Sequence, residues 1–202
     1  MDIDPKEVIE TAKTAHEASG ARSARLNAAV AVTIAVLATF MGICKVKDDN
    51  IVQAMQQAQA DKIDHWAFYQ ARNLRQEVAE ATVVQLELAR LGASPANTDA
   101  YAAAIAKYRA LGEDQARKKE EVRLQAAQDQ KTYDALNYRD DQFDLSDALI
   151  AIAIAMLAVT ALTQLWALYW ASLVPTAFGV LMGVAGLTAL PIHPDALVRL
   201  LS

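Results

Sequence analysis

The sequence contains few prolines and glycines, the residues that break helices, and only one cysteine. Its five prolines leave two long gaps, from Pro5 to Pro95 and from Pro95 to Pro175. Because proline interrupts helices and glycine punctuates them, two very long helical stretches are permitted. The lone cysteine, Cys44, excludes an intrachain disulfide framework. The three histidines lie too far apart in the sequence to suggest a zinc site.

Charge is nearly absent from two parts of the chain and concentrated between them. Residues 26–44 and 145–190 are predominantly apolar, whereas residues 45–144 carry 14 Lys and Arg against 17 Asp and Glu. A bilayer core requires about 20 apolar residues per spanning helix, so the sequence predicts an integral membrane protein with a large insert outside the membrane. The balanced charge of that insert argues against nucleic-acid binding, which needs clustered positive charge.

The predicted fold class is an all-α membrane protein with three transmembrane helices and a long antiparallel helical hairpin, coiled-coil-like, inserted between spans one and two. A proline after Asp4 and a glycine at Gly20 suggest the two ends of a separate first helix. Gly92 and Pro95 form the turn signal of the insert. The expected segments are an N-terminal amphipathic helix at 1–22, transmembrane helices at 23–45, 145–166 and 173–190, a hairpin at 46–144 with its turn at 92–97, and a tail at 191–202.

Eight apolar residues and one glutamine in the outgoing half of the insert follow the spacing of a coiled-coil seam. These residues are Ile63, Ala67, Gln70, Leu74, Val78, Ala81, Val84, Leu88 and Leu91. The returning half is interrupted by Gly112 and then carries charge on every face over residues 113–121. Two interpretations of that charged stretch stay open: a solvated helix surface, or a polar layer buried between the hairpins of an oligomer.

Small residues recur along the predicted spans. Lipid offers no hydrophobic drive for helix association, so spans pack closely along such residues. The seams are Ala28, Ala31, Ala35, Ala38 and Gly42 in span one, and Gly179, Gly183 and Gly186 in span three. We expect packing within and between subunits along them. No ionisable residue lies deep in a span, which argues against an ion-coupled transporter.

The densest motif is an aromatic and basic run at residues 64–76. Its candidate assembly residues are Trp66, Phe68, Tyr69, Gln70, Arg72 and Arg75. An exposed helix does not need three aromatic residues there, so we expect the partner helix to cover one side and another subunit the other. Pairing the hairpin about its turn predicts that Arg72 contacts Glu120 or Glu121. The alternative is a site in which Arg72 and Arg75 bind a carboxylate or phosphate.

This run, with Asn27 at the head of an alanine-rich span, resembles the signature of a bacterial membrane family called domain of unknown function 4337. The resemblance covers nearly the whole chain and rests on Trp66, Tyr69, Gln70 and the base after Ala71. It implies one span, a helical insert and two further spans. The chain departs from the pattern at Arg72 and Arg75, where lysines are expected, and at residues 163–165, where basic residues are expected. The family name implies no activity.

The sequence therefore predicts a non-enzymatic, homo-oligomeric scaffold or assembly protein of the bacterial inner membrane, with no catalytic residue, cofactor or metal. Its expected partners are the lipid bilayer, further copies of the chain, and another membrane protein. The alternatives are a pore-forming or gating oligomer whose axis span one lines, with Thr33 and Thr39, and an accessory subunit of a larger complex. More basic residues precede span one than follow it closely, which favours a cytoplasmic N-terminus and a periplasmic hairpin.

Overall fold

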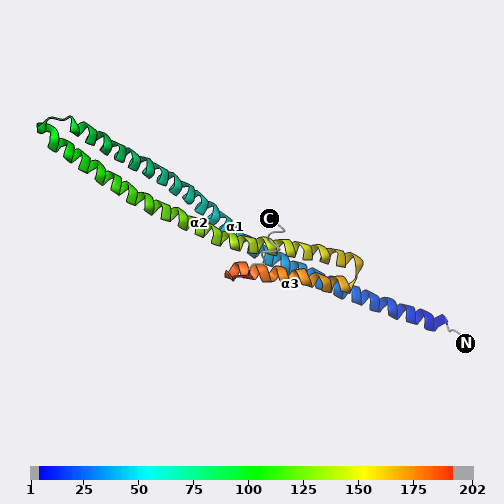
Figure 1. The fold of residues 1–202 in the computed structure, drawn as a ribbon. Coiled ribbons are helices and arrows are strands. Elements are labelled where there is room, and N and C mark those ends of the chain that lie inside the picture. The colour runs from blue at the N-terminus through cyan, green and yellow to red at the C-terminus, as the bar shows by residue number, and fades with distance from the viewer. Residues whose placement is uncertain (1–4, 193–202) are drawn as a thin grey trace. The chain divides into compact units, whose positions relative to one another are not determined.

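The computed structural model describes the backbone of residues 5–192 and, of the side chains, those from residue 22 to residue 192. In this part of the chain all regular structure is helical, which confirms the predicted all-α class. Helix α1 covers Pro5–Leu91, the short helix η1 covers Pro95–Asn97, α2 covers Thr98–Thr163 and α3 covers Trp166–Thr188 (Figure 1). Helices α1, α2 and α3 each contain a stretch long and apolar enough to cross a membrane.

The chain divides into two compact units. The bundle unit comprises the residues up to Val52 and from Tyr138 onward, so it contains α3 and one part each of α1 and α2. The hairpin unit comprises Gln53–Asn137, which holds the remaining parts of α1 and α2 and the turn that joins them.

Helix α1 passes Gly20 without a break, so residues 5–22 do not form the separate helix that the sequence suggested. A glycine that ends a helix adopts the left-handed conformation, and no glycine has a positive φ in the part of the chain that the structure describes. A single glycine inside a helix costs only about 1 kcal/mol relative to alanine, and the neighbouring alanine and arginine residues favour continuation. The predicted cap at Asp4 lies outside the described residues.

The core of the bundle unit is built from α1 and α2. Its buried side chains are Leu26, Val30 and Leu37 from α1 and Ile150, Ala153 and Leu157 from α2. Partly buried side chains of α3, among them Tyr169 and Val180, pack against this core. Other apolar side chains of the same helices, such as Val36 and Ile152, are exposed and suited to contact with lipid.

Two residues reverse the chain between α2 and α3. Gln164 has a positive φ of 57° and Leu165 is extended, so α3 begins at Trp166 rather than near residue 173 as predicted. The Gln164 Nε2 donates to Asn27 Oδ1 at 2.8 Å, which ties the turn to α1. This boundary was hard to predict because Gln164 is neither glycine nor asparagine, the residues that usually adopt this conformation.

Three aromatic residues lie close together at the beginning of α3. Trp166, Tyr169 and Trp170 occupy the first helical turns and stack edge to face, with ring centroids 5.7 Å apart in both neighbouring pairs. Pro175 was expected near the start of this helix but lies in its interior. Pro175 has no N–H to donate to the Ala171 carbonyl four residues earlier, and the helix continues through it. Thr176 donates to the Ser172 carbonyl at 2.8 Å.

In the hairpin unit, α1 and α2 run antiparallel and lie side by side (Figure 1). Cross-helix contacts fix the register: residue numbers fall along α1 as they rise along α2. Lys119 donates to Asn73 at 3.0 Å, and the His65 Nδ1 lies 2.6 Å from Asp129 Oδ2. The remaining contacts of this kind join Lys62 to Gln130 and Arg109 to Glu87. Gly112 does not interrupt α2, which continues through it.

Candidate functional site

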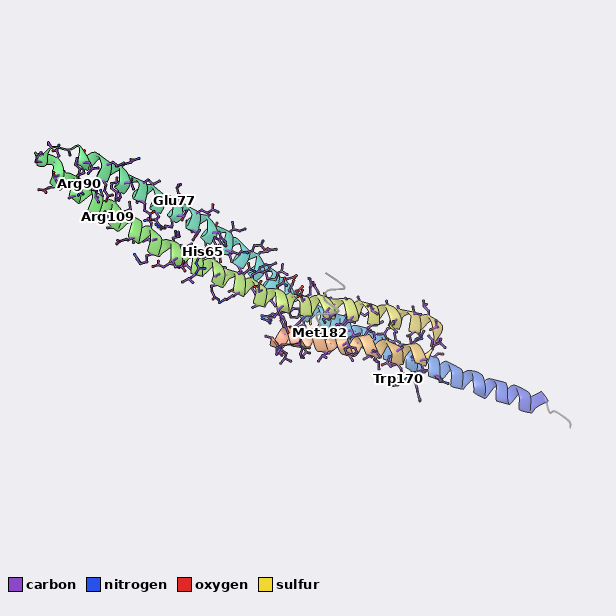
Figure 2. All side chains as sticks on the ribbon, in the orientation of Figure 1. His65, Glu77, Arg90, Arg109, Trp170 and Met182 are labelled. Carbon is purple, nitrogen blue, oxygen red and sulfur yellow. The ribbon has the colours of Figure 1, made fainter. Side chains whose placement is uncertain are left out.

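The face that α1 turns toward α2 in the hairpin unit mixes polar, small and apolar side chains, among them the buried Met55 and the half-buried Val83. His65, Arg72 and Ala79 follow one another at intervals of seven residues on this face (His65 is labelled in Figure 2). The Arg72 guanidinium donates to Gln115 Oε1 at 3.0 Å, and Gln115 is only 5% exposed. Ala79 is 1% exposed and packs beside Gly112, where an added Cβ would lie at an ordinary contact distance of 3.9 Å from the Ala79 Cβ. Hydrogen bonds, small residues and a few apolar side chains therefore hold the hairpin together.

The predicted coiled-coil seam faces away from α2. All nine of its residues, from Ile63 to Leu91, are exposed. The six large aliphatic members are each more than half exposed, with Leu74 at 61% and Leu88 at 64%. These residues are therefore not the surface along which α1 packs on α2, and no described element of the hairpin unit covers them. We call these nine residues the α1 stripe.

The aromatic and basic run does not form one cluster. Tyr69 is half-buried; its ring contacts Trp66 edge to face at 5.3 Å and lies 5.9 Å from the Lys119 ammonium. Trp66 and Phe68 are exposed on the two sides of the α1 stripe. The other motif residues divide in the same way: Arg72 faces α2, while Gln70 and Arg75 are exposed. Arg72 is thus engaged across the hairpin while Arg75 is exposed, and the alternative that the two bind an anion together stays a prediction.

The predicted ion pair of Arg72 does not form among the described residues. The antiparallel register is the expected one, but Arg72 donates to Gln115. The carboxylates of Glu120 and Glu121 pair with arginines of their own helix instead, Arg123 and Arg117. Arginines three or four residues away on one helix reach a carboxylate with less loss of side-chain freedom than a partner across the hairpin.

The charged stretch at residues 113–121 is mostly a solvated surface in this structure. Asp114 pairs with Arg117 at 2.6 Å and Lys118 at 2.6 Å, and these contacts lower the pKa of the Asp114 carboxyl. The Arg123 guanidinium likewise lowers the pKa of Glu120. Gln115 is the member of the stretch that is buried against α1. Exposed pairs of this kind contribute little to stability, a median of about 0–1 kcal/mol.

The three glycines of α3 lie where side chains of α1 and α2 approach its backbone. A Cβ at Gly179 would come within 2.8 Å of Ile150, one at Gly183 within 2.7 Å of Phe40, and one at Gly186 within 2.9 Å of Phe143. The buried Ser146 hydroxyl donates to the Gly179 carbonyl at 2.8 Å. The glycine face of α3 therefore packs against α1 and α2 of the same chain.

The small residues of span one behave in the opposite way. Ala28, Ala31, Ala35, Ala38 and Gly42 are all exposed, and a Cβ added at Gly42 would meet nothing within 4 Å. No part of the described chain covers this seam, which we call the α1 small-residue face.

The sequence reasoning missed an acidic cluster in the bundle unit. Asp48 is 4% exposed, and its Oδ2 binds Lys45 at 2.8 Å. Burial and a hydrogen bond with Asp48 raise the pKa of Asp140 to about 7, and burial likewise raises the pKa of Asp144. The hairpin register was the available signal, because it places residue 48 opposite residues 140–144.

Polar side chains elsewhere are used for structure. Among the residues that the structure describes, no group of three or more His, Cys, Asp or Glu is arranged to hold a metal ion. The open groove of about 290 Å³ beside Gly112 is lined by Glu80, Val83, Tyr108 and Arg109, and Arg109 is already paired with Glu87. The stripe and the small-residue face of α1 are therefore the candidate functional surfaces.

An all-helical chain with three helices apolar enough to cross a membrane indicates a multi-pass membrane protein. The chain belongs to the family described as Domain of unknown function (DUF4337), whose model matches residues 26–189. The match begins at the first core residue of span one and ends just after α3, so it includes both units. It confirms the resemblance inferred from the aromatic run. Comparison with curated proteins and with solved structures gives no match.

Proposed function

We propose that this protein is a non-enzymatic, homo-oligomeric scaffold of a membrane, in which three spans anchor a helical hairpin and copies associate through α1. The observation that carries the proposal is the exposure of the α1 stripe. Monomeric soluble surfaces rarely show contiguous apolar patches larger than a few hundred Å², and larger ones mark interaction sites. A stripe of this length in water is stabilised when another helix covers it.

In the proposed arrangement the spans lie at residues 26–44, 145–163 and 166–188, and the hairpin unit stands outside the membrane. The greater number of basic residues before span one favours a cytoplasmic N-terminus, with the hairpin on the opposite, periplasmic side. A bacterial inner membrane is the compartment that this arrangement and the family resemblance suggest.

No observation favours the pore hypothesis over the scaffold. Thr33 is half-buried, and its hydroxyl bonds the Ala29 carbonyl at 2.8 Å and lies 3.3 Å from the Tyr169 hydroxyl of α3. The Thr39 hydroxyl donates to the Ala35 carbonyl at 2.8 Å. Both hydroxyls are thus engaged by their own chain and do not form a free polar row for a channel axis.

The test is the mass of the protein in mild detergent, measured by light scattering or native mass spectrometry. One chain has a mass of 21.9 kDa, and the scaffold predicts a defined multiple of it. A strict monomer without partners would overturn the proposal. A stoichiometric second protein would replace the scaffold with the accessory-subunit alternative.

A further inference from the structure

We infer that the partner of α1 is α1 of a second copy, paired parallel and in register along the stripe at residues 63–91 and along the small-residue face at residues 28–42. This inference rests on the proposed function and specifies the surface that would perform it. Its grounds are the spacing, the area and the charge of the stripe, together with a separate observation in the bundle unit.

The spacing identifies the occupant as another helix. From Ile63 to Leu91 the nine stripe residues follow steps of three and four that average 3.5 residues, and they extend over four heptads. Apolar heptads sustained over three to four repeats indicate a coiled coil. A flat surface or a loop does not require this period, whereas a second helix with the same period inserts its side chains between those of the first.

The area of the stripe is sufficient for a stable pair. Its six large aliphatic side chains are 55–82% exposed and together present on the order of 700 Å² of apolar surface, more than the largest patch on a typical monomer. Trp66 at 41% exposure adds to one edge of the stripe. A standard interface buries about 800 Å² per partner, so one stripe against another reaches that class.

The charge pattern and the rest of the hairpin favour self-pairing. None of the nine stripe residues is charged, so a stripe can face itself without like-charge repulsion. Helix α2 offers no comparable surface, because Leu111 and Leu124 are its only exposed large aliphatic residues in the described hairpin unit. The surface that matches one α1 stripe is therefore another α1 stripe. Copies inserted in a membrane with the same topology present their α1 helices in the same direction, which makes the pairing parallel.

The bundle unit supplies an independent observation on the same helix. The small-residue face of α1 is exposed over its whole length and also advances by steps of three and four. Small residues allow two backbones to approach closely in lipid, and this is how spans associate. The glycines of α3, by contrast, are already in contact with their own chain. One helix thus carries an unpartnered packing face both within the membrane and outside it.

Disulfide cross-linking tests the pairing in the full-length protein in its membrane. Starting from Cys44→Ala, single cysteines are introduced at Leu74 or Leu88 in the stripe, and at Leu124 on α2 as a control of similar exposure. Ala35→Cys and the exposed Ile152→Cys form the matching pair within the membrane. Membranes are oxidised with copper phenanthroline, and the fraction of covalent dimer is measured on non-reducing gels. A disulfide requires Cβ atoms about 3.5–4.5 Å apart, so it reports close and direct contact.

Parallel in-register pairing predicts that Leu74→Cys and Leu88→Cys both form dimers, at least fivefold more than Leu124→Cys, and that Ala35→Cys exceeds Ile152→Cys. Cross-linking at only one of the two stripe positions would indicate antiparallel or staggered pairing and would overturn the inference. No cross-linking at either position, in variants whose detergent mass is still oligomeric, would also overturn it while leaving the scaffold proposal intact. A monomeric mass of the unsubstituted protein would overturn both.

Discussion

At the scale of single residues, the glycines of α3 determine how closely that helix approaches its neighbours. A Cβ at Gly183 would lie 2.7 Å from two ring atoms of Phe40 and 2.8 Å from the buried Ser146 hydroxyl. The Ser146 hydroxyl is fully buried and bonded to the Gly179 carbonyl, so it cannot move away without losing that hydrogen bond, and the half-buried Phe40 ring would also have to shift.

Gly183→Ala is therefore expected to lower the free energy of unfolding by about 1–3 kcal/mol, the usual cost of overpacking. Thermal unfolding in detergent measures the effect. Gly20→Ala is the matched control, since a Cβ there meets nothing within 4 Å. A Gly183→Ala protein as stable as the control would show that α3 packs differently.

A second residue-scale prediction concerns Asp140. Burial, a hydrogen bond with Asp48 and the charges of Asp144, Asp48 and Asp141 raise its pKa to about 7. The folded protein therefore binds this proton more tightly than the unfolded chain, in which an aspartate titrates near its ordinary value of 3.8. The stabilisation is complete below about pH 4 and is lost as the pH rises through about 7.

Asp140→Asn removes this titration, because an amide stays neutral at every pH. The variant is expected to be more stable than the unsubstituted protein at pH 8 and to show a flatter stability profile between pH 5 and pH 8. Denaturant midpoints measured across that range provide the comparison. Parallel profiles for the two proteins would mean that Asp140 is ionised in the folded state at pH 5 and above.

At the scale of elements, the end of α3 is held by side chains of α2. Arg139 Nη2 donates to the Gly186 carbonyl at 2.8 Å, and Gln142 Nε2 donates to the carbonyls of Leu190 and Ile192 at 2.9 and 2.7 Å. The last turn of a helix leaves carbonyls without intrahelical partners, and Arg139 supplies such a bond at Gly186, while Gln142 holds the segment that follows the helix.

Gln142→Leu keeps the volume of this buried side chain but removes its donor, at an expected cost of about 1–3 kcal/mol for the carbonyls left unpaired. Backbone amides of residues 186–192 should then exchange with deuterium at least tenfold faster, as followed by mass spectrometry. Gln128→Leu, at an exposed position of the same helix, should leave that exchange unchanged.

Much of the element structure could be predicted from the sequence, since long intervals without proline and apolar spacing of three and four define the helices and the hairpin register. Whether the α1 stripe faces α2 or faces away from it could not be predicted. Its period is equally suited to an inner and an outer face, and the usual assumption places apolar residues inside. The face of α1 that packs on α2 instead makes specific contacts across the hairpin, such as the hydrogen bond from Arg72 to Gln115 and the packing of Ala79 beside Gly112. The pattern of one helix alone does not contain such contacts. The chain reversal at Gln164 could not be predicted for a similar reason, because its hydrogen bond to Asn27 joins the turn after α2 to a different helix, α1.

At the scale of the whole molecule, the proposed topology places the turn of the hairpin on the side of the membrane opposite the N-terminus. Ser94 in this turn is exposed. In a Cys44→Ala background, Ser94→Cys should be labelled by a membrane-impermeant maleimide added to intact spheroplasts. Labelling only after the membrane is permeabilised would reverse the orientation. A cytoplasmic protein with an exposed cysteine serves as the integrity control.

The exposed stripe of α1 also bears on how a cell would regulate the amount of this protein. An apolar surface in water is the feature by which chaperones and proteases distinguish unfinished proteins from finished ones. A copy without its partner would carry that feature permanently, although its own fold is complete. Surplus copies would then be removed until those that remain are paired, and the steady-state abundance would follow the capacity for assembly more than the rate of synthesis.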